Sequence, residues 1–165
     1  MSVLPILSWP DARLATVCEP VKDPVAVKAL AEDMLETMYA APGRGLAAPQ
    51  VGVMARMFVM DAGWKDGAPT PVVCINPEIV ATSGKRVMGE EACLSIPGVS
   101  AQVERHAVIT LRWQDVTCVW HEKNLTGFEA ICAQHEYDHL DGLVIFDRLE
   151  DEARATLERE YEAVA

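Results

Sequence analysis

The sequence predicts an α+β fold, a single domain over residues 1–165 in which short antiparallel strands surround a central helix. Three observations support this class. One amphipathic helical pattern precedes a series of short strand patterns, and two further helical patterns follow them. The composition, with 50% hydrophobic and 24% charged residues, is typical of a globular chain. A chain of 165 residues is also long enough to bury its own core.

The first part of the chain predicts an arm, a helix and a loop. Residues 1–22 hold several prolines and little periodicity, which favours an extended arm. Asp23-Pro24 is typical of a helix start, and apolar residues at three- and four-residue steps continue the helix to about Tyr39. Residues 43–52 are rich in glycine and alanine, so they form either a loop lining a site or a plain connection to a strand.

Strand patterns fill the middle of the chain, at residues 53–60, 72–75, 79–81, 107–113 and 116–122. The first is continuously apolar and predicts a buried strand, followed by a surface turn at residues 63–71. Asn76-Pro77 separates the second pattern from the third. The fourth alternates apolar and polar residues, and we expect the fifth to pair with it.

Two helical patterns close the chain. The central helix follows Gly127 and runs to about Asp141, with Gly142 where a left-handed C-terminal cap belongs. A last, acidic helix is expected over residues 151–162. The chain therefore ends in helices, as an α+β order requires.

Charge and composition exclude several classes of partner. A net charge of −11 argues against nucleic acid and anionic membrane surfaces. The chain lacks an apolar run near the ~20 residues of a membrane span, and its start lacks the features of a signal peptide. We therefore expect a cytoplasmic protein. The five cysteines are scattered and odd in number, which is not typical of a disulfide framework.

The central helix contains His135-Glu136-x-x-His139. On a helix this spacing places both imidazoles on one face, where they can share a metal ion, while Glu136 is suited to act as a general base. A catalytic site of this kind needs a third protein ligand. A known pattern places a third histidine six residues after the second, but that position is Ile145.

Other third ligands remain open. The acidic residues of the last helix are typical of a solvated face, and His121 lies in a strand pattern that favours the surface. His106 remains as a candidate. Cys93, in a short loop predicted between strands, is the stronger one because a thiolate binds iron, zinc, cobalt or nickel well. A cysteine alone is more often a buried thiol, so the assignment needs the other motifs.

Three stretches in order resemble the signature motifs of peptide deformylases. They are Gly43-x-Gly-Leu-Ala-Ala-Pro-Gln50, Glu91-Ala-Cys-Leu-Ser95 and Gln134-His-Glu-x-x-His139, and the similarity runs to about Leu149. The resemblance implies a metal-dependent hydrolase that removes the N-formyl group from N-formylmethionyl peptides of nascent proteins and releases formate. It also implies that Cys93, His135 and His139 hold one divalent ion, Fe²⁺ by family preference, with Zn²⁺, Ni²⁺ or Co²⁺ as alternatives.

The resemblance also implies roles for other residues. Glu136 is the general base, and the Gln50 side chain and the Leu94 N–H hold the oxyanion. Gly45 contacts the peptide backbone. The pocket for the methionine side chain is implied at four positions, namely Phe128, Ile131, Cys132 and His135.

The sequence departs from the family pattern in three places. Ala92 replaces a glycine of the second motif, so it either strains the backbone or crowds the substrate. Arg44 replaces an aliphatic residue, and we expect it to point to solvent or else to reach a carboxylate on the substrate. The acidic residues of the last helix argue against ribosome docking through a basic C-terminal helix. The alternatives are an amidase with a shifted N-acyl substrate range and a non-catalytic binding protein that retains the fold.

Overall fold

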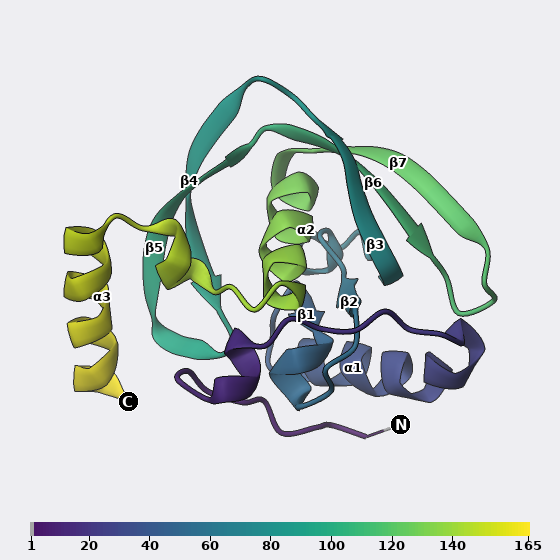
Figure 1. The fold of residues 1–165 in the computed structure, drawn as a ribbon, viewed down its shortest axis with the longest axis horizontal. Helices are drawn as coiled ribbons and strands as arrows, with labels where there is room; N and C mark the ends of the chain where they lie inside the picture. The colour runs from purple at the N-terminus through teal and green to yellow at the C-terminus, as the bar shows by residue number, and fades with distance from the viewer. Residues whose placement is uncertain (1) are drawn as a thin grey trace.

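The protein folds as two antiparallel sheets around a central helix (Figure 1). The computed structural model describes residues 2–165, and Met1 of the predicted arm lies outside the described residues. The five-stranded sheet has the order β1-β2-β3-β6-β7, and β4 and β5 form a separate hairpin. The predicted α+β class is confirmed.

The strands are β1 (Gly45–Ala47), β2 (Met57–Met60), β3 (Val72–Thr82), β4 (Arg86–Cys93), β5 (Ile96–His106), β6 (Val108–Gln114) and β7 (Trp120–Thr126). The helices are α1 (Lys28–Ala40), α2 (Gly127–Leu140) and α3 (Asp151–Val164). Five short 3-10 turns connect them, at Ala12–Ala15, Pro24–Val27, Ala48–Val51, Trp64–Asp66 and Ile145–Arg148.

The central helix α2 lies between the two sheets, with β4 and β5 on one side and β6 and β7 on the other (Figure 1). Its small residues Ala130 and Ala133 are fully buried and pack with Phe58 and Leu111 of the large sheet. A second cluster joins the hairpin to the C-terminal part of the chain through Ile96 and other apolar side chains. Most of α2 from Ala130 to Leu140 is buried in this arrangement, including the polar side chains of Gln134, His135, Glu136, Asp138 and His139.

Gly142 ends the region of α2 as predicted. Its φ is 75°, and an added Cβ would lie 2.8 Å from the backbone of Ala15. Positive φ and this close approach both favour glycine. The N-terminal arm therefore passes directly over the end of α2, where the N–H of Cys18 donates to the carbonyl of Leu140.

The middle of the chain differs from the prediction in continuity. The two strands predicted on either side of Asn76-Pro77 form one strand, β3, whose register with β6 shifts between Ile75 and Glu78. Asn76 has a φ of 50°, and its side-chain amide donates to the carbonyl of Val21. Tertiary hydrogen bonds thus turn an expected break into a bulge.

Three strand boundaries were also wrong. Of residues 53–60 only Met57–Met60 form a strand, because a 3-10 turn and Gly52, with a φ of 84°, precede them. The predicted loop at 43–52 contains the short strand β1. The pattern at 116–122 begins as a turn, in which Asp115 accepts from two backbone N–H groups, and the paired strand begins only at Trp120.

The hairpin β4–β5 and both ends of the chain also differ from the predicted secondary structure. The hairpin alternates buried and exposed side chains, but its many polar residues hid the pattern from prediction. The arm is not fully extended, because Ala12–Ala15 form a 3-10 turn. The last helix is confirmed and ends at Val164, two residues later than expected. None of the helices among residues 2–165 combines the length and the apolar character that crossing a bilayer requires.

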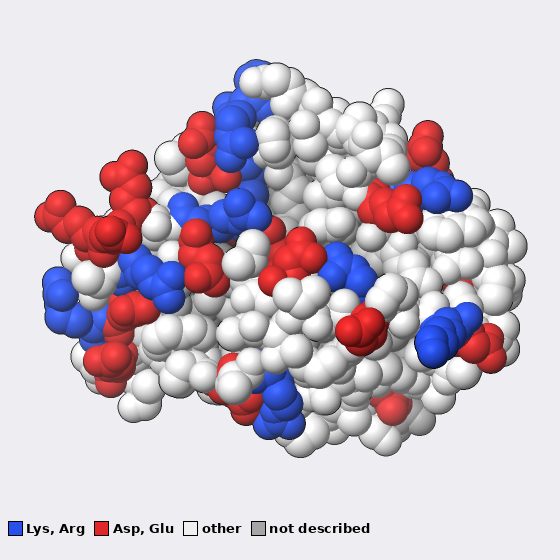
Figure 2. All heavy atoms as spheres, in the orientation of Figure 1, with Lys and Arg blue, Asp and Glu red and all other residues white. Residues whose placement is uncertain are grey.

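Helix α3 lies at the edge of the molecule, against the hairpin (Figure 1). The hydroxyl of Tyr161 donates to the carbonyl of Trp9, which fastens the helix to the arm. Red acidic side chains gather at this end in Figure 2, interleaved with fewer blue ones. Residues 147–165 hold seven acidic residues and three arginines, so this surface is acidic.

Candidate metal centre and substrate cavity

Three candidate ligands meet between α2 and the hairpin. Cys93 is the last residue of β4, rather than part of a loop, and His135 and His139 lie one turn apart on α2. Their donor atoms all lie within 4.8 Å of one another, and Cys93 Sγ lies 3.5 Å from His139 Nε2. All three residues are buried. One thiolate and two imidazoles fit a divalent transition metal.

The environment of the two histidines differs. Burial, together with His135, lowers the pKa of His139 well below its usual range, so this imidazole is neutral as a ligand must be. Burial also acts to lower the pKa of His135, but the carboxylates of Glu136 and Glu91 and the Cys93 thiol outweigh it and raise that pKa. A metal ion and a proton compete for such a nitrogen.

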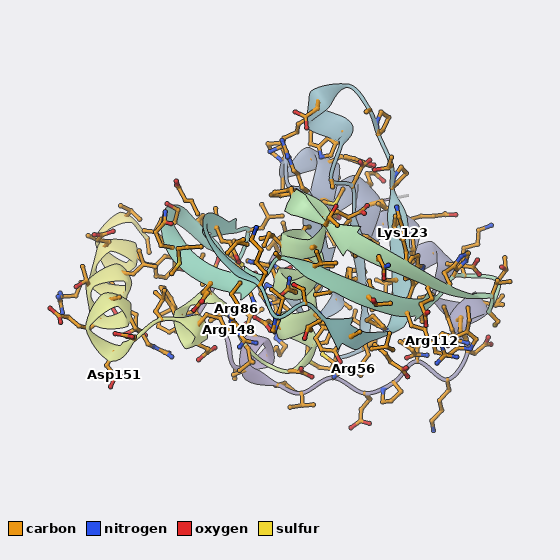
Figure 3. The ribbon with its side chains drawn as sticks, turned by 90° about the horizontal axis from the view of Figure 1, so that it is seen from above. Arg56, Arg86, Arg112, Lys123, Arg148 and Asp151 are labelled. Carbon is orange, nitrogen blue, oxygen red and sulfur yellow. The ribbon has the colours of Figure 1, made fainter. Side chains whose placement is uncertain are left out.

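A buried chain of charges supports His135. Glu91 Oε1 lies 3.0 Å from His135 Nδ1, and both Glu91 oxygens accept from Arg105 at 2.8 and 2.9 Å. Arg105 also donates to Asp138 at 2.6 Å, and Asp138 accepts from Arg148 at 2.6 and 2.9 Å. Figure 3 places Arg148 between α3 and the central helix. This series of charged side chains thus extends from the candidate ligand His135 to Arg148 at the surface.

These charges stabilise one another. Burial acts to raise the pKa of Glu91, but hydrogen bonds from Arg105 and His135 outweigh it and hold that pKa at about 2. Glu91 is therefore an anion that accepts from His135. This hydrogen bond leaves Nε2 of the ring for a metal and sets the orientation of the imidazole.

Glu136 faces the cavity beside the ligands. Its side chain is buried, and burial raises its pKa to about 7. Its Oε1 has no hydrogen-bond partner among residues 2–165, a state that is rare for a buried carboxylate outside functional sites. Gly45 lies against it: an added Cβ would collide with Glu136 Oε2 and lie 2.8 Å from Cys132 Sγ. Only glycine leaves room for the carboxylate here.

Gln50 lies at the same centre with a fixed amide. Its Oε1 accepts from the N–H of Ala47 at 2.9 Å, which identifies the other atom as the NH₂ group. That Nε2 donates to Ser95 Oγ at 3.0 Å and lies 3.7 Å from Cys93 Sγ. The amide donor therefore faces the thiolate and the space beside it.

A cavity of about 680 Å³ opens in front of the centre. It is lined by nearly all of the predicted site residues, namely Arg44, Gly45, Gln50, Ala92, Cys93, Leu94, Phe128, Ile131, Cys132, His135 and Glu136. His139 lies behind this lining, on the side of Cys93. The volume of the cavity matches that of cavities that take small ligands and short peptides.

Arg44 was expected to point to solvent, but its side chain lies along the wall of the cavity. Its guanidinium carbon lies 4.8 Å from the centre of the Phe128 ring, and its side chain is 26% exposed. Ala92 is exposed, and the positive-φ residues other than glycine are Asn76 and Cys118 among residues 2–165. The alanine therefore strains no backbone, and crowding of the substrate is the remaining interpretation.

The other two histidines lie elsewhere. His106 contacts the carbonyl of Ser83, and His121 contacts Asp115 at 2.7 Å on the exposed face of β7. Sequence reasoning missed Arg105 and Asp138. Asp138 lies inside the His-Glu-x-x-His motif, which was a usable signal. No comparable sequence signal marked Arg105, because a single arginine in a polar strand pattern is ordinary.

The sequence and the fold of the chain are similar to those of known proteins. The polypeptide deformylase family model matches residues 3–155. A peptide deformylase of Afipia carboxidovorans is 48% identical over 150 residues, 90% of this chain and 88% of the relative. The crystal structure of a Legionella pneumophila peptide deformylase superposes with a TM-score of 0.92 at 36% identity, over 99% of this chain and 95% of that one. The structure of an Ehrlichia chaffeensis peptide deformylase in complex with actinonin superposes with a TM-score of 0.92 at 36% sequence identity, over 99% of this chain and 98% of that one.

Proposed function

The chain belongs to the polypeptide deformylase family and is a metal-dependent hydrolase that removes the N-formyl group from N-formylmethionyl peptides; we propose that the centre described above carries this reaction. The observation that supports this most directly is the cluster of one buried cysteine and two buried histidines beside a buried carboxylate. We propose that the enzyme acts in the cytoplasm, on nascent chains.

Cys93, His135 and His139 are the proposed ligands of one divalent metal ion. When bound, the ion supplies Lewis acidity, which polarises the formyl carbonyl and lowers the pKa of water. Fe²⁺ is the proposed metal, since the thiolate and imidazole set suits it, and Zn²⁺, Ni²⁺ and Co²⁺ suit the same set. Elemental analysis after anaerobic purification tests the identity of the metal, and a predominance of another metal would contradict it.

The Cys93→Ala variant tests the ligand set without relying on activity. Loss of the thiolate leaves two protein ligands, fewer than the three of known catalytic centres. We expect the purified variant to hold little metal, against about one ion per chain in the unaltered protein. Full retention of metal by the folded variant would contradict the assignment.

Glu136 is proposed to move the proton. Its carboxylate lies inside the cavity beside Gly45 and has an oxygen without a partner among residues 2–165, so it is free to accept a proton from the attacking water. It then returns the proton to the leaving amine, and the products are formate and a free N-terminal methionine.

Gln50 and Leu94 are proposed to stabilise the oxyanion. The Gln50 NH₂ group is held toward the centre by two hydrogen bonds, and Leu94 follows Cys93 at the turn of the hairpin. Such pre-oriented donors contribute about 3 kcal/mol each to the transition state in known hydrolases.

The substrate is proposed to lie along the cavity. The methionine side chain would contact Phe128, Ile131 and Cys132, which line it together with His135. The backbone of Gly45 would contact the peptide. The Ehrlichia chaffeensis relative binds actinonin, and its structure superposes over nearly the whole of this chain, which supports ligand binding in this cavity. The acidic α3 does not support ribosome docking through a basic helix.

One experiment tests the proposal. Metal-loaded protein is incubated with formyl-Met-Ala-Ser, and the formate released is measured. We expect turnover, a loss of about 10²–10⁴-fold in kcat for Glu136→Ala with the metal retained, and little cleavage of acetyl-Met-Ala-Ser. Absence of formate from folded, metal-loaded protein would overturn the proposal. Acetyl cleavage at a comparable rate would indicate a broader amidase.

A further inference from the structure

Arg44 is a charged residue in the wall of the cavity that the proposed chemistry does not use. It precedes Gly45, and its own carbonyl lies 3.6 Å from Cys132 Sγ, so its backbone is next to the proposed methionine pocket. Its side chain extends along the cavity wall and lies over Phe128, which also lines the cavity and is 49% exposed. The guanidinium is therefore at the partly exposed rim of the cavity, where a peptide would leave the proposed methionine pocket.

The guanidinium is weakly held by its polar neighbours. Its Nη1 lies 3.5 Å from the carbonyl of Ala62, and its Nη2 lies 3.9 Å from Asp66 Oδ1. The Asp66 side chain is 71% exposed, and an ion pair of this length and exposure contributes little. Most of the five N–H donors of Arg44 are thus available to another acceptor.

The ring of Phe128 keeps the guanidinium ready for such an acceptor. Stacking on an aromatic face orients the plane of the group and reduces the entropy that it loses when it binds. Lys65 adds a second positive charge to the lining. Glu90 is the exposed carboxylate of the lining, and it keeps its negative charge while accepting from Ser100 Oγ at 2.8 Å. The outer part of the lining therefore holds two cations, Arg44 and Lys65, against one carboxylate, and this balance favours an anion in a protein whose net charge is −11.

We propose that Arg44 is a specificity-determining residue that binds a carboxylate side chain in the two residues that follow formyl-methionine. The proposal rests on the proposed function, because it needs the formyl group at Glu136 and the methionine in its pocket. Arginine donates two parallel N–H bonds to a carboxylate, and a peptide with aspartate or glutamate supplies the two acceptor oxygens, whereas one with glutamine or lysine does not. The bound carboxylate would replace Asp66.

The experiment compares matched pairs of peptides. Their C-termini are amidated, so that the side chain is their only carboxylate. The pairs are formyl-Met-Glu-Ser and formyl-Met-Gln-Ser, then formyl-Met-Ala-Glu and formyl-Met-Ala-Gln. We expect kcat/KM to favour the glutamate peptide of at least one pair by about fivefold at low salt, the effect of one partly exposed charge pair. The preference should fall in 0.5 M NaCl because salt screens it.

Variants of Arg44 test the cause. In Arg44→Leu the preference should fall to about one, and in Arg44→Lys it should be intermediate, because the charge stays and the second N–H bond is lost. Arg112→Leu is the matched control. Arg112 also stacks on an aromatic ring, that of Trp120, and pairs with Glu78, but it does not line the cavity and lies at the end of the molecule opposite α3 (Figure 3).

The outcomes separate this inference from the proposed function. Formate from formyl-Met-Ala-Ser with equal rates within both pairs would overturn the role of Arg44 and leave the deformylase centre intact. A preference that persists in Arg44→Leu would also overturn it. Absence of formate from every peptide would overturn both. A preference that is lost in Arg44→Leu and kept in Arg112→Leu would support it.

Discussion

Two arginines on opposite sides of the centre differ in how they are held. Arg105, behind the metal ligands, is 4% exposed and donates to Glu91 and Asp138 at 2.6–2.9 Å. Arg44, at the rim of the cavity, is 26% exposed and has polar partners at 3.5 and 3.9 Å. An arginine whose three nitrogens all donate to buried carboxylates holds other side chains in place, whereas one with free donors is available to a ligand. The buried inner wall around Arg105 therefore holds side chains in place, whereas the rim around Arg44 is available to a ligand.

The inner wall, the buried side of the centre around Arg105, is held by ion pairs between buried side chains. Each member of the chain from His135 to Arg148 has its partner, so the buried ions cost less than they would alone. The rim depends on an aromatic contact and on one long ion pair with an exposed carboxylate. Substitutions in the inner wall should therefore change stability and metal affinity, and those at the rim should change substrate choice.

The largest effect is expected for Arg105→Met. The side chain fits the space, but the change removes the arginine that Glu91 and Asp138 share and leaves them with His135 and Arg148 as their remaining partners. Breaking a buried ion pair in this way costs about 3–5 kcal/mol in the free energy of unfolding. Urea unfolding of the unaltered protein and the variant measures this cost.

Arg112→Met serves as the control for this prediction. Arg112 pairs with Glu78 at 3.3 Å on the surface, where such pairs contribute less than about 1 kcal/mol. Equal losses in the two variants would mean that the buried chain gives no more stability than a surface ion pair. The contrast between the inner wall and the exterior would then fail.

An intermediate effect is expected for Glu91→Gln. The amide keeps the shape of the side chain but loses the charge that accepts from His135 Nδ1. Loss of such a partner typically lowers metal affinity by about 10–100-fold. Competition with a chelator, followed by the absorption of bound Co²⁺, measures the affinity directly.

Glu90→Gln is the matched control, because Glu90 precedes Glu91 on the same strand but is exposed and accepts from Ser100 Oγ. It should leave the affinity for Co²⁺ unchanged. An equal affinity in Glu91→Gln and the unaltered protein would show that the orientation of His135 does not depend on this carboxylate.

The same contrast explains what the sequence could predict. His135, Glu136 and His139 lie four residues apart or less, so helical geometry alone brings them together. Cys93 was predicted as the third ligand because its motif resembles the second signature motif of peptide deformylases. Arg105 meets Asp138 across 33 positions of the chain, because strand β5 packs against helix α2. Contacts that depend on tertiary packing leave no local pattern, whereas the hairpin has an alternating pattern that its many polar residues hid.

The smallest effect is expected for Ala92→Gly, at the junction of the two regions. Ala92 precedes the proposed ligand Cys93 but is exposed and lines the cavity, so we expect its methyl group to occupy space that a bound peptide would use. Its removal should raise kcat/KM on formyl-Met-Ala-Ser by at most about fourfold, the equivalent of one buried methylene. The gain should come through a lower KM, because the position contacts the peptide and not the reacting carbonyl.

Glycine also weakens a strand, by about 0.5–1 kcal/mol, so stability and activity should change in opposite directions. Ala81→Gly is the control for this part. Ala81 is exposed on β3, opposite Thr110, and does not line the cavity, so it should lose the same stability without any change in KM. A lower rate or a lost metal in Ala92→Gly would place this residue with the inner wall, and the boundary between the two regions would then lie closer to the rim.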